Sequence, residues 1–137
     1  MDKHEELRQW FSLAGQNLGV AKHLAASYHP TPIETICNQC QQSAEKDLKG
    51  FLFLNDVEFP KTHDLRTLLT MCVNLNPDFS KFRKQMMYLN NFGAIPRYPN
   101  ELQLNENDSK SAIRFAEDIK EFVMNITHKQ LSKNSPV

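Results

Sequence analysis

Glycine is scarce in this sequence: the 137 residues include only four, and they are scattered along the chain. Neither of the glycine-rich patterns that cradle phosphate, G-x-x-x-x-G-K-[ST] and G-x-G-x-x-G, occurs. The nucleophile elbow G-x-S-x-G is missing as well. With only seven prolines beside the four glycines, collagen-like and low-complexity classes are also excluded.

The sequence has no excess of either charge, because 16 Lys and Arg balance 16 Asp and Glu. Binding of nucleic acid through overall positive charge is therefore excluded, and only a local basic patch could serve. No apolar run approaches the 18 or so residues that span a membrane, and the first ten residues, MDKHEELRQW, are rich in charge. These features predict a cytoplasmic protein without a signal peptide or membrane contact.

Apolar residues make up 40% of the chain, which is enough for the core of one domain. They recur three and four positions apart, which predicts helices rather than strands. The stripes cover residues 7–28, 33–52, 65–73, 79–92 and 112–126. The fold class is therefore all-α: an antiparallel up-and-down bundle of four long helices and one short helix. We expect a single domain over residues 1–128 and a frayed polar tail over 129–137.

Helix ends are predicted from capping residues. Thr31 is expected to cap the second helix with Pro32 in its first position, and Asn76 with Pro77 should begin the fourth. Gly93 is expected to end the fourth helix in a left-handed conformation. The last helix is expected to be capped by Asn107, Asp108 or Ser109.

The three cysteines carry no recognisable redox or metal pattern. Cys37 and Cys40 have C-x-x-C spacing but lie on an apolar stripe inside a helix, away from the helix N-terminus that would activate a thiol. A zinc site would need two further ligands, and Cys72 supplies only one. We therefore predict buried, reduced cysteines, with no metal and no cofactor.

Two groups of residues have more than one reading. His63 lies in a loop between Thr62 and Asp64, where these residues can cap the third helix, form part of a site, or do both. Lys46 and Lys49 lie off the apolar stripe of the second helix, and Glu45 can pair with Lys49 at i, i+4. They belong either to a solvated face or to a phosphate site.

The same helix carries a strip of small and polar residues along which another backbone or a ligand can approach closely. The strip comprises Gln39, Gln42, Ser43, Lys46 and Gly50.

A further candidate lies in the irregular crossover of residues 94–106, where Arg97 and Tyr98 stand between two prolines. A guanidinium can fork onto phosphate, and a phenol ring can stack on a base. The prolines restrict the segment and so lower the cost of ordering it. The alternative is a purely structural lid over the end of the bundle.

Three elements of the sequence resemble the HEPN domain family. Residues 40–52, CQQSAEKDLKGFL, are similar to its QQAAEKALKALL helix, and residues 60–65, PKTHDL, resemble its P-x-T-H-D-L turn. Residues 97–99, RYP, match its RYP element, and the closing helix also fits. The resemblance covers about Trp10 to Val123 and implies an all-α, commonly dimeric bundle.

The resemblance implies two kinds of role. Some HEPN members are metal-independent ribonucleases with an Arg-x4–6-His motif, and others accompany a nucleotidyltransferase and are thought to bind nucleotide. Here no His follows Arg97 at that spacing, nor any of the other four arginines. Ribonuclease chemistry of the family type is therefore not expected. No nucleotidyltransferase motif is present either, so that enzyme would be a separate chain.

The sequence therefore predicts a non-catalytic, homodimeric HEPN protein that binds a nucleotide or nucleic acid and assists a nucleotidyltransferase in trans. Two alternatives stay open: a ribonuclease with a rearranged site, in which Arg97 and His63 meet, and a dimeric interaction module without nucleotide binding. The predicted binding residues are Lys46, Lys49, Thr62, His63, Arg97 and Tyr98.

Overall fold

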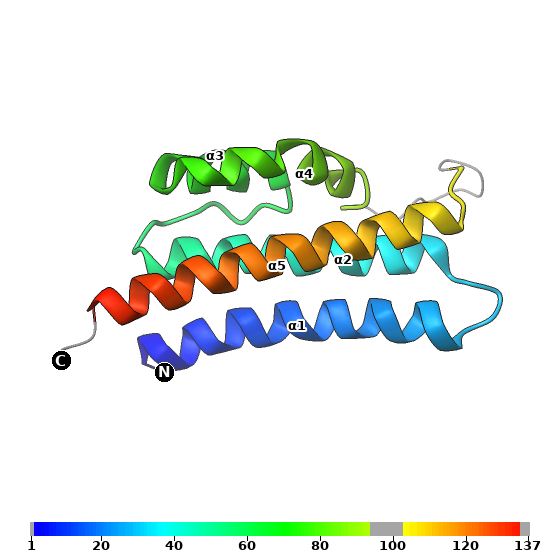
Figure 1. Ribbon diagram of the computed structural model, residues 1–137, viewed down its shortest axis with the longest axis horizontal. Coiled ribbons are helices and arrows are strands. Elements are labelled where there is room, and N and C mark those ends of the chain that lie inside the picture. Colours follow the sequence, from blue (N-terminus) through cyan, green and yellow to red (C-terminus); the bar gives the residue numbers. More distant parts are fainter. Residues whose placement is uncertain (1, 94–102, 135–137) are drawn as a thin grey trace.

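The computed structural model describes residues 2–93 and 103–134. The helices are α1 (Lys3–Ser27), α2 (Ile33–Leu54), α3 (Leu65–Leu75), the 3-10 helix η1 (Pro77–Phe82), α4 (Arg83–Asn90) and α5 (Glu106–Asn134). No strand occurs in these two ranges, and the predicted all-α bundle is confirmed. The long helices α1, α2 and α5 run lengthwise, while α3 and α4 form a shorter layer on one side (Figure 1).

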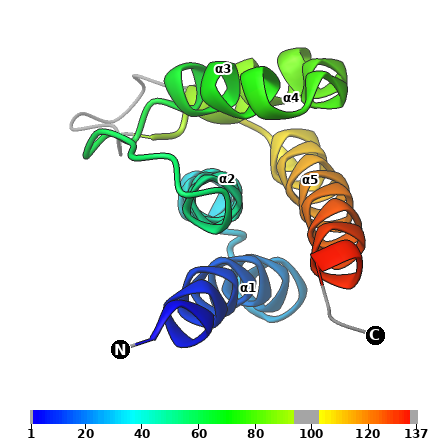
Figure 2. The ribbon, with the colours of Figure 1, turned by 90° about the vertical axis from the view of Figure 1, so that its left-hand side faces the viewer.

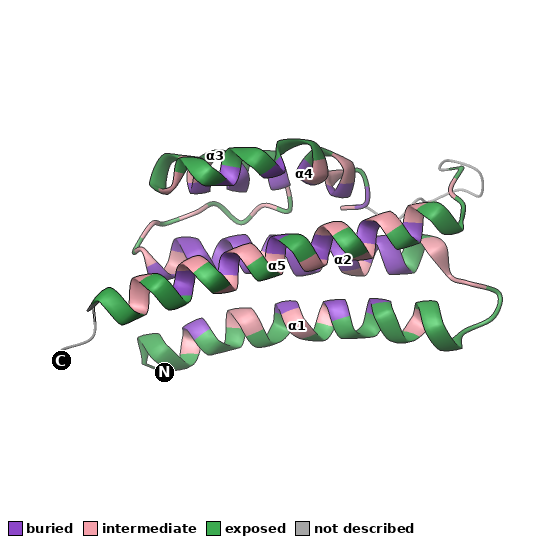
Figure 3. Ribbon diagram, in the orientation of Figure 1, coloured by how far each residue is buried: buried purple, intermediate pink, exposed green. Residues whose placement is uncertain are grey.

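Helix α2 lies at the centre of the bundle. Seen end-on, α1, α5 and the α3–α4 layer surround it (Figure 2), and it packs on each of them. Most of its residues are therefore buried, including polar ones (Figure 3). A helix buried on nearly all sides must find partners for its polar side chains inside the protein.

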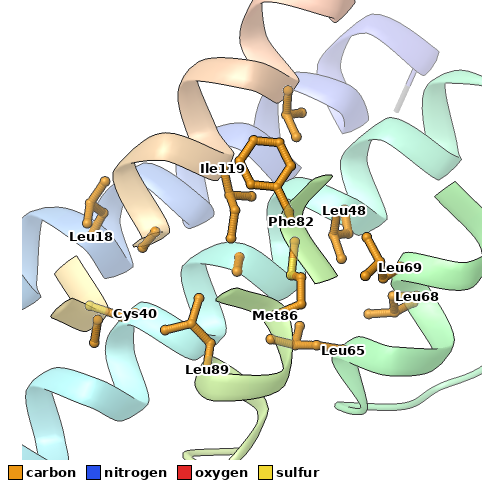
Figure 4. Close-up of a cluster of buried hydrophobic side chains, with 14 of the residues drawn as sticks. Leu18, Cys40, Leu48, Leu65, Leu68, Leu69, Phe82, Met86, Leu89 and Ile119 are labelled. Atoms are coloured by element: carbon orange, nitrogen blue, oxygen red, sulfur yellow. The ribbon is translucent and has the colours of Figure 1, made fainter. Parts of the chain in front are cut away.

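The core is built from the inward faces of all these helices. Figure 4 shows Leu48 of α2 beside Leu65, Leu68 and Leu69 of α3, with Phe82 and Met86 next to them. The three cysteines are buried, as predicted, and burial raises the pKa of each thiol to about 12. None of the helices in the described ranges combines the length and the apolar character needed to cross a bilayer.

Several helix ends differ from the predictions. Pro32 rather than Thr31 is the N-cap of α2, and no described side chain caps the helix there. Pro32 has φ −83° and ψ 76°, which is not helical geometry, so the helix begins one residue later than predicted. The fourth segment begins at Asn76 as predicted, since its side chain accepts from the Asp78 amide, but it is split into η1 and α4.

The prediction that Gly93 caps α4 is wrong, because α4 ends at Asn90 and Gly93 has no positive φ. Helix α5 also begins before the predicted caps. The side chain of Asn105 accepts a hydrogen bond from the Asn107 amide, and Asp108 accepts from the Asn105 amide in return. At its other end α5 continues without a break to Asn134, so residues 129–134 are helical rather than frayed.

Candidate functional site

A buried carboxylate in the middle of α2 organises the residues around it. The Glu45 side chain is 6% exposed and accepts from three partners. Lys49 Nζ lies 3.0 Å from Oε2, His63 Nδ1 lies 3.0 Å from Oε1, and Gln41 Nε2 lies 3.4 Å from Oε1. Both carboxylate oxygens are therefore bonded, and the ammonium of Lys49 balances the charge.

His63 connects this buried carboxylate to the surface. Its side chain is 78% exposed, although its Nδ1 rests against Glu45. A carboxylate at Nδ1 fixes the tautomer that carries its proton there, and this leaves Nε2 facing away. Among the described residues, Nε2 has no hydrogen-bond partner. The arrangement thus presents an oriented imidazole nitrogen to solvent.

The loop that carries His63 is held at several points. Gln41 Nε2 donates to the His63 carbonyl at 2.9 Å, and the Thr62 hydroxyl accepts from the Asp64 amide at 3.0 Å. Asp64 is the N-cap of α3, in line with the capping interpretation of residues 62–64, and accepts from the Arg66 amide. Its carboxylate also binds the Arg66 guanidinium, which holds the pKa of Asp64 below its usual value. These contacts fix the loop on α2, so the imidazole is positioned in advance.

The two predicted lysines have different surroundings. Lys49 Nζ is nearly buried between Glu45 and the ring of Phe59, whose centroid is 5.9 Å away. Lys46 Nζ donates to Asn17 Oδ1 on α1 at 2.6 Å, and burial lowers the pKa of this ammonium. The predicted Glu45–Lys49 pair is confirmed, but it is buried rather than solvated. The structure thus joins Lys49 to His63 through Glu45 and binds Lys46 to α1.

The strip of small and polar residues on α2 receives the backbone of α1. Ser43 Oγ donates to the Ala14 carbonyl at 2.9 Å. At Gly50 a Cβ atom would lie only 2.6 Å from the ring of Phe11, so a larger residue there would force this ring or α1 to shift. The close approach that the sequence indicated is therefore an intramolecular helix contact.

Arg97 and Tyr98 lie outside the described residues. The last described residues before them, Phe92 and Gly93, lie beside the cluster formed by Glu45 and its three partners. Asn38 Nδ2 donates to the Phe92 carbonyl at 2.7 Å. A Cβ added to Gly93 would lie 3.5 Å from Gln41 Nε2, and Gln41 bonds both Glu45 and the His63 loop. The crossover therefore starts next to the residues that position His63.

A second buried carboxylate, Asp47, lies two residues further along α2 and is fully buried. Its Oδ1 accepts from Lys120 Nζ of α5 at 3.2 Å, but its Oδ2 has no hydrogen-bond partner in the part of the chain that the structure describes. Burial raises the pKa of Asp47 to about 6, and the nearby Lys120 ammonium opposes part of this rise. Asp47 thus sits between helices, with no link to the His63 loop among its hydrogen bonds.

Sequence reasoning missed three of these polar residues: Gln41, Asp47 and Lys120. A signal for the cluster was present, because Gln41, Glu45 and Lys49 recur at intervals of four and share one helix face. No comparable signal joins Asp47 to Lys120, which are 73 positions apart. No group of three or more His, Cys, Asp and Glu side chains in the described ranges is placed to hold a metal ion.

The geometry can be compared with known proteins. The sequence model of the HEPN domain family matches residues 7–127. The crystal structure of an archaeal HEPN homologue is similar to this one, with a TM-score of 0.67 and 24% sequence identity. The similarity covers 87% of this chain and 95% of that one. No curated protein matches the chain. Since the family model spans most of the sequence and includes α2, the His63 loop and most of α5, the chain belongs to the HEPN domain family.

Proposed function

We propose that this chain is a HEPN protein that binds a nucleotide or a nucleic-acid phosphate beside His63, works as a homodimer and assists a nucleotidyltransferase supplied in trans. The observation that supports the proposal most directly is the exposed imidazole of His63 held by the buried carboxylate of Glu45. A buried charged cluster that ends in one exposed, oriented ring nitrogen is suited to meet a ligand.

The chemistry of the cluster suits an anion. A protonated His63 would donate from Nε2 to a phosphate oxygen, while its Nδ1–H stays bonded to the Glu45 carboxylate. The loop is already fixed by Gln41 and by the Asp64 cap, so little ordering is needed on binding. Lys49 would not contact the ligand directly, because its ammonium is bound to Glu45 on the protein side of the His63 imidazole. Lys46 and Thr62 would flank the site.

Arg97 and Tyr98 complete the proposal. They follow Gly93 by four and five residues in the sequence, and Gly93 lies against Gln41 of the cluster. We assign the guanidinium of Arg97 to a second phosphate contact and the ring of Tyr98 to stacking on a base. The absence of any His at the ribonuclease spacing after Arg97 supports a binding role rather than cleavage.

Calorimetric titration with ATP, GTP and a short RNA tests the proposal. We expect saturable binding that weakens at least tenfold in His63→Ala, because a charge-assisted hydrogen bond contributes roughly 1.5–3 kcal/mol. Arg97→Ala should weaken it as well. His23→Ala is the control, since His23 is exposed on α1. Equal affinity in the wild type and in both the His63 and Arg97 variants would contradict the proposal.

One observation favours a second candidate, a ribonuclease with a rearranged site. A carboxylate at Nδ1 and an open Nε2 form the usual arrangement of a general base. His63 would take the proton of an RNA 2′-hydroxyl while that oxygen attacks the adjacent phosphorus and the 5′-oxygen leaves, taking a proton from water. Cleavage of RNA in the presence of a chelator, abolished in His63→Ala, would establish this activity. Intact RNA would exclude it.

A further inference from the structure

A basic groove lies on the side of the bundle where η1 and α4 meet α5. Its volume is about 730 Å³. Three of the residues that line it are cations, two are aromatic and none is acidic. The lining comprises Ser80, Lys81, Arg83, Lys84, Gln85, Tyr88 and Phe115. In a chain whose net charge is zero, a groove with this lining is a local concentration of positive charge.

The cations of the groove are available to a ligand. Lys81, Arg83 and Lys84 are exposed, and none of them forms an ion pair with another described residue. The ammonium of Lys81 lies over the ring of Phe122, with Nζ 4.4 Å from the centroid, so a cation–π contact positions this charge at the exposed surface. The segment that carries the three cations, residues 77–90, contains one carboxylate, Asp78.

The aromatic residues add ring surface to this charge. Tyr88 and Phe115 are half-buried and meet edge-to-face, with centroids 5.4 Å apart. The Tyr88 hydroxyl is bonded to Asp108 at 2.6 Å, so the polar end of that side chain is already satisfied. Arg114 lies over Phe115, with Cζ 5.2 Å from the ring centroid. A ligand therefore meets planar groups and positive charge together.

We infer that this groove binds the backbone of a single-stranded nucleic acid, with phosphates on Lys81, Arg83 and Lys84 and a base against Tyr88 and Phe115. Cations that follow a backbone and aromatic rings that accept bases are the combination by which proteins hold single strands. An acidic peptide would use the cations but would give the rings no planar partner. The inference rests on the proposed function, because it extends a nucleotide-binding protein to a longer strand.

Fluorescence anisotropy with a labelled twelve-nucleotide oligoadenylate RNA tests this site. The double variant Arg83→Glu/Lys84→Glu is compared with Lys129→Glu/Lys133→Glu. All four residues are exposed, both changes alter the net charge equally, and the control pair lies at the far end of α5, outside the groove. Glutamate in the first turn of α4 suits the helix dipole, so the groove variant should fold, which circular dichroism checks.

We expect the groove variant to bind the RNA at least tenfold more weakly, while the control pair changes affinity less than threefold. The slope of log K against log salt should fall by about 1.4 in the groove variant, since each lost phosphate contact on a single strand removes about 0.7. An equal loss in both double variants would overturn the inference, and so would an absence of RNA binding. Polyglutamate that competes as well as RNA would also overturn it and would indicate an acidic protein partner.

The same measurements distinguish this inference from the proposed function. If RNA binding falls in the groove variant but not in His63→Ala, and ATP does not bind, the groove stands and the His63 proposal fails. If ATP and RNA binding both fall in His63→Ala and the groove variant matches its control, the proposed function stands and the groove inference fails.

Discussion

Two buried carboxylates on the same helix have different surroundings. Glu45 and Asp47 are two residues apart on α2, so their side chains leave opposite sides of the helix. Both are almost fully buried. In Glu45, Oε1 is bonded to Gln41 and His63, and Oε2 is bonded to Lys49 and His63. Asp47 has one oxygen bonded to Lys120 and one that finds no partner among the described residues.

The difference follows from what each carboxylate faces. Glu45 faces the loop before α3, where several donors converge and one of them, His63, reaches solvent. Asp47 faces the junction of α2 with α5, where a single lysine arrives from the neighbouring helix. A satisfied cluster holds its members in fixed positions, whereas a half-satisfied one costs stability. We therefore propose that ligands bind beside Glu45, and we expect substitutions around Asp47 to change the free energy of unfolding more than substitutions around Glu45.

The largest effect is expected when Lys120 is replaced. Lys120→Met keeps the length of the side chain but leaves the carboxylate of Asp47 buried without a cation. Breaking a buried pair in this way costs about 3–5 kcal/mol. Urea denaturation at pH 8 should show this loss in the free energy of unfolding. The loss should be much smaller at pH 5, where Asp47, with its raised pKa, is already protonated in the folded state.

Lys129→Met is the matched control for this variant, because Lys129 is exposed on the same helix. Its effect should stay within about 0.5 kcal/mol at both pH values. If Lys120→Met is no more destabilising than this control, the ion pair between Asp47 and Lys120 makes no measurable contribution to the stability of the protein.

The pH dependence of stability isolates Asp47 itself. Its pKa in the folded protein is raised to about 6, above the value of about 3.9 in an unfolded chain. Between these values the folded state binds more protons than the unfolded state, so the contribution of Asp47 to stability falls as the pH rises from about 4 to 6. A shift of about two units corresponds to roughly 3 kcal/mol.

Comparison with Asp47→Asn removes the contributions of other groups, such as Asp64 and Asp108, whose lowered pKa values act in the opposite sense. The wild type should lose stability relative to Asp47→Asn as the pH rises through this range. Parallel curves for the two proteins, from urea denaturation at each pH, would mean that Asp47 has nearly the same pKa in both states.

Removal of the other carboxylate should have a smaller effect. Glu45→Ala leaves the ammonium of Lys49 without its partner, but this long side chain can extend to solvent, as Asp47 cannot. We expect a loss of about 2 kcal/mol in urea denaturation, and less for Glu45→Gln, which retains hydrogen-bond acceptors. A loss as large as that of Lys120→Met would contradict the contrast between the two sites.

The sequence predicted the helices well and the polar interior poorly, for a physical reason. Apolar periodicity reports which face of a helix is buried, and it placed α1, α2 and α3 close to their observed bounds, whereas α5 extends well beyond its predicted stripe at both ends. It cannot report that a helix is enclosed on all sides, because this depends on how distant segments pack. Lys49 therefore looked like a surface residue, and the Asp47–Lys120 pair, joined across 73 positions, left no local pattern.

The smallest effects concern the α1 side of α2, where Gly50 lies three residues after Asp47. Gly50→Ala places a Cβ 2.6 Å from the ring of Phe11, so α1 or the ring must shift, and thermal denaturation should show a loss of about 1–2 kcal/mol. Gly19→Ala is the matched control, because a Cβ there meets nothing within 4 Å. It should raise stability by about 0.5–1 kcal/mol through helix propensity.

If both substitutions stabilise the protein, α1 can move away from α2 at little cost, and the strip on α2 is not a close helix contact. Opposite signs would show that glycine at position 50 is required by the approach of α1 and not by the helix itself.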